Sequence, residues 1–242
     1  WKWRRHGGAI TMANMFNDLN SNYALIICSD FLNLPIFKSL CHNKIGKTPI
    51  LAYFHENQAS YPWSPGDKDI ELERDFHYYF INQTTSLCAS WNYFNSMYHL
   101  ESYIEGLSRY LTKMPDHKNK ESLSLIESKS SVLHLGCDLK KLNKGPNKEN
   151  NKKPLILWNH RWEYDKNPEL FFEAMIEIKN RGLDFELVLL GERFASYPKI
   201  FKKGIEKLKD NITTYEYCSF EEYKDWLWKA DILPVTSIQD FF

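Results

Sequence analysis

Two short apolar runs on either side of an amphipathic segment constrain the fold of this chain most tightly. Residues 155–159 and 185–190 have the length and composition of buried strands. Between them, Asn167 can cap a helix that has Pro168 at its first position, and Gly182 can end that helix. A strand, a helix and a second strand in this order predict a parallel pair joined by a right-handed crossover.

The same alternation of strands and helices extends through the rest of the chain. Expected strands are 23–28, 49–54, 85–91, 131–135, 213–217 and 232–236, and further expected helices are 71–83, 93–111, 200–208 and 220–229. Strands that alternate with helices are typical of α/β domains with parallel sheets. We therefore expect two Rossmann-like α/β domains.

A polar segment, residues 140–153, separates the two expected domains. It is rich in Lys and Asn, contains Gly145-Pro146 and has Leu142 as its one large apolar residue. Such a segment buries too little surface to fold, so it predicts a solvated linker, with a basic RNA-contacting loop as the alternative. The domains are then 1–139 and 154–242. Both are expected to be incomplete, because the chain lacks an initiator Met and stops soon after a strand-like run.

Bulk composition excludes several classes of protein. Lys plus Arg equals Asp plus Glu at 31 each, so no overall field attracts the chain to nucleic acid, although a local basic patch still could. Five scattered cysteines without metal-type spacing favour a reducing compartment, and we expect a cytoplasmic protein. No run approaches the ~20 apolar residues of a membrane span. No convincing Asp-x-Asp loop or Gly-x-Gly-x-x-Gly turn occurs, so we expect neither a divalent metal nor a dinucleotide cofactor.

Arg161 and Lys166 lie in the densest cluster of charged and aromatic residues, between an expected strand and the start of an expected helix. Ligands bind outside the carboxyl ends of parallel strands, and a helix N-terminus offers N–H groups to anions. Arginine can grip phosphate with two hydrogen bonds, and lysine adds a compact charge. The pair could neutralise a diphosphate leaving group. Alternatively, the two cations pair with Glu163 and Asp165 in a surface loop, and spacing alone leaves both interpretations open.

His55 is the candidate for chemistry in the first half. It follows an expected strand, and its imidazole could donate a hydrogen bond to a substrate hydroxyl or to a developing leaving-group oxygen. The alternative is a hydrogen-bonded structural histidine. Glu56, Asn57 and Gln58 are its expected polar partners, and we assign Glu56 no role as a nucleophile.

Two further groups of residues are candidates for contact with a substrate. The first six residues mix aromatic and cationic side chains, including Trp3 and Arg4, as surfaces that stack on and neutralise RNA do. The alternative is packing plus solvated charge. His117, beside Asp116, is either a surface residue or a residue that contacts a substrate.

Several of these segments resemble glycosyltransferase family 4, which has the GT-B fold. The resemblance rests on the Arg161 and Lys166 spacing after the first strand of a second α/β domain, and it implies that this pair binds the donor diphosphate. Gly191-Glu192 resembles the turn that lies close to the donor. Asp240 stands where the family usually has the first Glu of its Glu-x7-Glu motif, which implies a contact to the sugar and a role in catalysis.

Two longer motifs, residues 53–58 and 159–169, resemble the tRNA-queuosine mannosyltransferase group more closely, as do residues 1–4 and 114–117. This resemblance implies transfer of mannose from the nucleotide sugar GDP-mannose to queuosine in tRNA, with retention at the anomeric carbon. The resemblance to family 4 implies that His55 contacts the donor sugar or supports the reaction centre. The alternatives are a family 4-like enzyme with another sugar donor and a glycan, lipid or small-molecule acceptor, or a non-catalytic nucleotide- or RNA-binding remnant. The acceptor-side residues are expected to be Trp3, Arg4, His55, Glu56, Asn57, Gln58 and His117.

Overall fold

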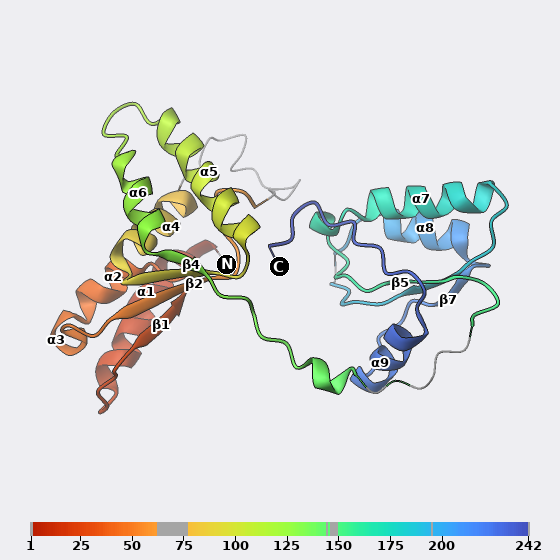
Figure 1. The fold of residues 1–242 in the computed structure, drawn as a ribbon, viewed down its shortest axis with the longest axis horizontal. Helices are drawn as coiled ribbons and strands as arrows, with labels where there is room; N and C mark the ends of the chain where they lie inside the picture. Colours follow the sequence, from red (N-terminus) through yellow and green to blue (C-terminus); the bar gives the residue numbers. More distant parts are fainter. Residues whose placement is uncertain (1, 62–76, 144, 146–149, 195, 242) are drawn as a thin grey trace. The chain divides into compact units, whose positions relative to one another are not determined.

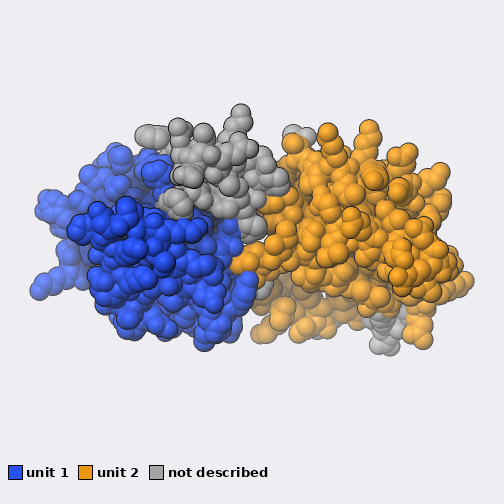
Figure 2. All heavy atoms as spheres, turned by 90° about the horizontal axis from the view of Figure 1, so that it is seen from above, with its two compact units in different colours: residues 1–136, 241–242 blue, residues 137–240 orange. Residues whose placement is uncertain are grey.

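The computed structural model describes residues 2–61, 77–143, 145, 150–194 and 196–241. The chain divides into two compact units (Figure 2), one made of residues 1–136 with 241–242 and the other of residues 137–240. The first part of the expected helix 71–83 lies outside the described residues, as do parts of the expected linker 140–153.

The first unit contains a four-stranded parallel sheet in the order β1-β2-β3-β4. Its register places Ile26 opposite Ile50. The strands are β1 (Ile26–Ser29), β2 (Ile50–Phe54), β3 (Trp91–Phe94) and β4 (Ser130–Val132), and the helices are α1 (Lys2–Asp18), α2 (Leu34–Leu40), α3 (His42–Ile45), α4 (His77–Cys88), α5 (Met97–Lys113) and α6 (Glu121–Ser128). The expected parallel α/β architecture is confirmed in this half.

The core of the first unit forms on one face of this sheet. Alternate residues of β2 are buried, and Phe54 stacks on Phe94 with ring centroids 4.6 Å apart. Tyr103 of α5 is fully buried beside them, and its hydroxyl lies 2.7 Å from Ser86 Oγ, so the polar end of the ring is satisfied. On the other face, Ile27 and other apolar side chains of the strands remain exposed.

The second unit contains a three-stranded parallel sheet, β5 (Leu155–Trp158), β6 (Glu186–Leu189) and β7 (Ile212–Thr214). Figure 1 shows α7 (Pro168–Asn180) and α8 (Ile200–Leu208) on one face and α9 (Phe220–Lys229) on the other. All four residues of β5 are buried, as expected for a parallel strand covered on both faces. The short helices η1 (Leu139–Lys141) and η2 (Tyr164–Lys166) complete the unit.

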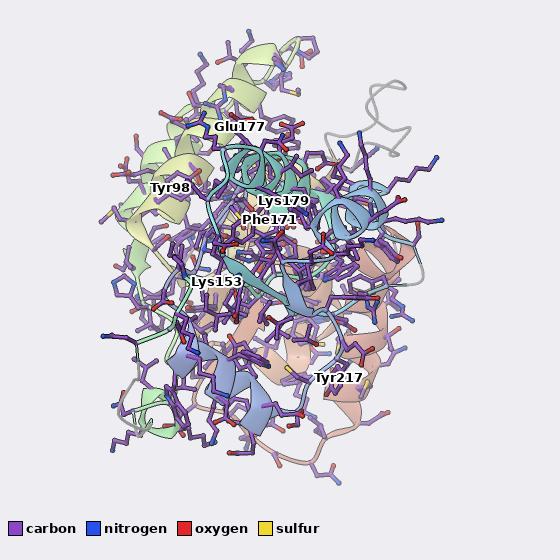
Figure 3. The ribbon with its side chains drawn as sticks, turned by 90° about the vertical axis from the view of Figure 1, so that its right-hand side faces the viewer. Tyr98, Lys153, Phe171, Glu177, Lys179 and Tyr217 are labelled. Carbon is purple, nitrogen blue, oxygen red and sulfur yellow. The ribbon has the colours of Figure 1, made fainter. Side chains whose placement is uncertain are left out.

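Aromatic packing joins the helices of the second unit to its sheet. Trp158 of β5 stacks on Phe171 of α7, which is labelled in Figure 3, with centroids 5.4 Å apart. A Cβ added at Gly204 of α8 would lie 2.1 Å from a ring carbon of Phe172. A glycine therefore allows α8 to approach α7 closely.

Some expected elements of the first half are wrong. The expected strand 85–91 is mostly helix, because α4 continues to Cys88 and β3 begins at Trp91. The expected helix 93–111 begins later, after Ser96, whose side chain accepts a hydrogen bond from the N–H of His99 at 3.1 Å. The long helix α1 was not expected, and tertiary burial of Ala9 on its inner face compensates for its weak helical pattern.

One further segment differs from expectation. The expected strand 232–236 forms no regular strand, and within it Ile232 makes a single parallel bridge to Ile156. In the described part of the expected linker, Leu142 accepts a hydrogen bond of 2.7 Å from the indole N–H of Trp228 on α9. No helix in the described ranges has the length and apolar character needed to cross a membrane.

Candidate functional site

The connection from β5 to α7 holds the two cations that the sequence singled out. Asn167 adopts the left-handed conformation with φ 49°, and its side-chain oxygen accepts a hydrogen bond from Leu170 N–H at 3.4 Å. Pro168 is the first helical residue, so the expected cap is confirmed. Arg161 and Lys166 therefore lie at the carboxyl end of β5, just before the positive end of a 13-residue helix.

Lys166 is held by two carboxylates. Its Nζ lies 3.3 Å from Asp165 Oδ2 and 2.9 Å from Asp240 Oδ1, and the Lys166 side chain is only 14% exposed. Two hydrogen bonds to main-chain carbonyls reinforce this contact. Thr236 Oγ1 donates to the Lys166 carbonyl at 2.7 Å, and the Ile238 N–H donates to the Asp165 carbonyl at 2.9 Å. The structure thus brings together Lys166 and Asp240, two of the expected donor-side residues.

This contact also affects the pKa of Asp240. Burial, the largest single effect, would raise this pKa, but the hydrogen bonds from Lys166 and Ser237 and the nearby positive charges together outweigh burial, so the pKa is lowered. The pKa of His160, which lies in the turn after β5, is also lowered, but in this case burial is the main cause. The site therefore presents a carboxylate and a neutral imidazole near neutral pH.

Arg161 is paired much more loosely. Its guanidinium lies 2.9 Å from Glu163 Oε2, and its side chain is 48% exposed. Local pairing of both cations, one of the alternatives drawn from the sequence, is thus observed. However, an exposed ion pair contributes only about 0–1 kcal/mol, so a polyanion can replace Glu163 at little cost. Arg161 can turn toward a ligand, whereas Lys166 is anchored.

Gly191 and Glu192 join this turn to the end of β6 through backbone contacts. Gly191 has φ 111°, and a Cβ there would lie 2.0 Å from the carbonyl oxygen of His160. The N–H of Trp162 donates to the carbonyl of Glu192 at 3.0 Å. Both expected donor-side residues of this turn therefore lie against the segment that carries Arg161.

A hollow of about 680 Å³ opens beside these two turns, within the range of small-molecule sites. Tyr217 stands at this hollow with 91% of its surface exposed and can be found beside α9 in Figure 3. Aromatic rings and an amide around a cavity of this size suit a flat heterocycle that also forms hydrogen bonds. The lining residues are Asn159, Leu190, Gly191, Glu192, Arg193, Tyr217, Cys218, Ser219, Phe220 and Tyr223.

Sequence reasoning missed most of this lining. Arg193 could have been predicted from the sequence, because it directly follows the Gly191-Glu192 turn. In the structure its guanidinium lies 5.1 Å from the centre of the Trp162 ring. Tyr217 gave no signal, since an aromatic residue after a strand usually packs into a core. The first turn of α9 is closed by a capping box between Ser219 and Glu222, which fixes the far wall of the hollow.

In the first unit, His55 lies immediately after β2 with its side chain 51% exposed. Its backbone N–H donates to Asp30 Oδ1 at 3.0 Å, and its Nδ1 lies 3.6 Å from the same oxygen. The Asp30 carboxylate raises the pKa of His55, against the opposing effect of burial. The Tyr53 ring packs edge-on against the imidazole at 4.9 Å.

The other expected acceptor-side residues have different surroundings. Gln58 Nε2 donates to Glu56 Oε1 at 3.2 Å, so these two side chains form one polar group. Asn57 is fully buried, and its side-chain oxygen accepts hydrogen bonds of 3.0 Å from the N–H and the hydroxyl of Ser60. Asn57 therefore stabilises the turn after β2.

The remaining acceptor-side candidates lie on other elements. Arg4 is exposed on α1, and Trp3 belongs to the same helix, its side chain outside the described residues. His117 is exposed between α5 and α6 with φ 40°. Within the described residues, neither Arg4 nor His117 contacts His55. The described ranges also contain no group of three or more His, Cys, Asp or Glu residues that could hold a metal ion.

A buried histidine, His99, is linked to His55 through the side chain of Asn95. Its Nδ1 is 2.8 Å from Asn95 Oδ1, and the Asn95 amide nitrogen donates to the His55 carbonyl at 2.9 Å. Because Asn95 uses its amide nitrogen toward that carbonyl, Nδ1 of His99 must carry the hydrogen of their shared bond. Burial lowers the pKa of His99 to about 3, so the ring is neutral in the folded protein.

This buried neutral ring makes the stability of the first unit depend on pH. The pKa of His99 is lower in the folded than in the unfolded chain, so its contribution to stability is present above about pH 6.5 and is lost as the pH falls toward the folded value. Between about pH 7.5 and 5 this single group should cost about 2 kcal/mol. Hydrogen exchange of β2 and β3 amides measures it. The His99→Gln variant should lack this part of the pH dependence, and the exposed His42→Gln should keep it.

Comparisons with known proteins agree on a family and a fold. The family model described as tRNA-queuosine alpha-mannosyltransferase N-terminal matches residues 1–137. The tRNA-queuosine alpha-mannosyltransferase of Drosophila melanogaster is 29% identical over 256 residues, an alignment that covers 100% of this chain and 64% of that protein. The chain therefore spans less than two thirds of this relative.

Solved structures with much lower identity share the architecture. The catalytic domain of starch synthase IV from Arabidopsis thaliana, bound to ADP and acarbose, has a TM-score of 0.63 at 13% identity, covering 96% of this chain and 55% of that chain. A trehalose-phosphate synthase (UDP-forming) from Burkholderia vietnamiensis has a TM-score of 0.59 at 12% identity, covering 98% and 57%. These likenesses concern the fold alone, and they confirm the expected GT-B class.

Proposed function

The chain belongs to the tRNA-queuosine alpha-mannosyltransferase family, and from this premise we propose that it is part of a retaining glycosyltransferase that modifies queuosine in tRNA. The donor in this proposal is GDP-mannose and the transferred hexose is mannose. The name of the Drosophila relative supports the sugar and the acceptor. The GT-B fold supports a nucleotide sugar as donor.

One observation carries the donor half of the proposal: a half-exposed arginine lies on a turn that a largely buried lysine fixes in place. Arg161 and Lys166 are held at the carboxyl end of β5, before the start of α7. Gly191 and Glu192 connect this turn to the hollow of about 680 Å³. We propose that the hollow receives the nucleoside and that the two cations bind the diphosphate.

The proposed reaction exchanges one bond at the anomeric carbon for another. The bond from this carbon to the β-phosphate oxygen breaks, and a bond to a queuosine hydroxyl oxygen forms on the same face. The hydroxyl proton passes to the departing phosphate oxygen. Arg161 and Lys166 stabilise the negative charge that develops on the diphosphate, in place of a divalent metal. Asp240, paired with Lys166, is proposed to contact the sugar.

His55 is proposed to act at the acceptor side of the reaction centre. Because its pKa is raised, the imidazole holds a proton to higher pH than free histidine does. A protonated ring donates hydrogen bonds and accepts none. In this proposal His55 is therefore a hydrogen-bond donor to a sugar or phosphate oxygen and not a general base.

Nucleoside mass spectrometry tests this proposal directly. The chain is incubated with queuosine-containing tRNA and, in separate reactions, with GDP-mannose, a UDP-hexose or an ADP-hexose, each with and without EDTA. We expect a hexose on queuosine from GDP-mannose, unchanged by EDTA, and none on matched tRNA that carries guanosine at that position. No hexose from any donor would contradict the acceptor assignment. A hexose from another donor alone would contradict the choice of GDP-mannose, and loss in EDTA would contradict metal independence.

A further inference from the structure

Asp30 is a buried carboxylate at the end of β1 that no feature of the sequence singled out. Its side chain is 1% exposed, yet it lies against the half-exposed ring of His55 at the end of β2. Burial of a carboxylate is costly unless hydrogen bonds or opposite charges compensate it. Oδ1 of Asp30 accepts the His55 N–H at 3.0 Å and lies 3.6 Å from Nδ1 of the ring. The carboxylate therefore contacts both the backbone and the side chain of His55.

The backbone of His55 is held on its other side as well. Asn95, at the end of β3, donates from its amide nitrogen to the His55 carbonyl at 2.9 Å. Asn82 of α4 donates to the carbonyl of Asp30 at 3.1 Å, which fixes the strand end that carries the carboxylate. The peptide at His55 is thus held on both sides by buried side chains from neighbouring strand ends, and its imidazole is left to project from a rigid base.

The direction of this ring follows from the position of the carboxylate. An ionised carboxylate only accepts hydrogen bonds, so the ring nitrogen that faces Asp30 is favoured when it carries a hydrogen. That nitrogen is Nδ1, which leaves Nε2 as the nitrogen available to a ligand. His99 cannot take over this role, because its ring is neutral and its Nδ1 is engaged by Asn95.

We propose that Asp30 is a positioning residue, which holds His55 with a hydrogen on Nδ1 and so presents Nε2 to the reacting groups. The link to the reacting groups rests on the proposed function, whereas the orientation and tautomer are properties of the first unit alone. Among the described residues, the ionisable groups that face the His55 ring are Asp30, Glu56, Tyr53 and His99. Asp30 and Glu56 both raise the pKa of His55, and Asp30 has the larger effect.

Nuclear magnetic resonance of the chain with nitrogen-labelled histidine tests this proposal without an activity assay. The His55→Gln variant assigns the His55 signals. Above its midpoint of titration, His55 of the wild-type chain should carry its hydrogen on Nδ1. The Asp30→Asn variant keeps an oxygen that can accept the His55 N–H, and it should move the His55 midpoint to lower pH. The matched control is Asp18→Asn, which removes an exposed carboxylate at the end of α1 and should leave the midpoint unchanged.

The outcomes separate the two proposals. A neutral His55 ring with its hydrogen on Nε2 in the wild-type chain would overturn the positioning role, and this measurement needs no variant that might fold poorly. An unchanged His55 midpoint in folded Asp30→Asn would overturn it as well. If the titrations agree with expectation but no donor gives a hexose on queuosine, the positioning role stands for the ring and the proposed function fails. Where transfer is observed, the alkaline limb of its pH profile should move with the His55 midpoint, because the proposed donor role needs the protonated ring.

Discussion

Replacement of Arg161 by alanine is expected to lower the rate of hexose transfer by about 10²–10³-fold while tRNA binding and folding stay close to wild type. The side chain is half-exposed and contacts Glu163, so its loss leaves no buried charge behind. In the proposed reaction, Arg161 stabilises charge that grows as the diphosphate departs. Single-turnover rates with GDP-mannose and tRNA affinity, measured on the same preparation, check this expectation.

Arg181→Ala is the matched control for this variant. Arg181 follows α7, is exposed and contacts Glu177 at 2.9 Å, as Arg161 contacts Glu163 at the same distance. Its replacement should change neither transfer nor tRNA affinity. A similar loss of transfer in both variants would point to a general effect of surface charge. Equal losses of tRNA binding and transfer in Arg161→Ala would contradict its place on the donor side.

Replacement of Lys166 by methionine is expected to lower the free energy of unfolding of the second unit by about 3–5 kcal/mol. Methionine preserves most of the apolar length of the side chain but removes the ammonium group between Asp165 and Asp240. Asp165 is 2% exposed, so the removal acts on a carboxylate that water does not reach. Urea unfolding, monitored through hydrogen exchange of the β5 and β6 amides, measures the change in the free energy of unfolding.

Lys179→Met on α7 is the control for this second prediction. Lys179 also pairs with a carboxylate, Asp210, but at 3.5 Å and near the surface, where such a pair contributes about 0–1 kcal/mol. A loss in Lys166→Met no larger than in Lys179→Met would show that the Lys166 contacts are not structural. Loss of transfer without loss of stability would then leave Lys166 as a donor ligand alone.

The second unit was largely predictable because its signals are local. Asn167, Pro168 and the apolar spacing of α7 specify a helix without reference to the rest of the chain, and β5 is apolar throughout because both of its faces are covered. The first half was harder. The expected strand 85–91 begins with Thr85 and ends with Trp91, two residue types found in strands, but the core packs residues 85–88 as the last turn of α4. Likewise, burial stabilises α1 despite its glycine pair.

The candidate site divides in the same way. The positions of Arg161 and Lys166 could be predicted, because a strand, a turn and a capped helix are adjacent in sequence. Their different roles could not, since only burial separates an anchored lysine from a loosely paired arginine. Asp30 lies 25 residues before the histidine that it contacts, and parallel strand order alone brings the two together. Residues at strand ends are the ones to examine in such folds.

The contact between Gly191 and the carbonyl of His160 separates what can vary at this site from what cannot. A Cβ at this glycine would overlap a main-chain oxygen, and no change of a neighbouring side chain can relieve that overlap. Gly191 lines the hollow and meets the His160 peptide directly, whereas other lining residues such as Tyr217 and Arg193 have large side chains. Substitutions at Tyr217 or Arg193 can change the space in the hollow while the contact at Gly191 is kept. Under the proposed function, related chains can therefore diverge in nucleotide preference without rebuilding the site.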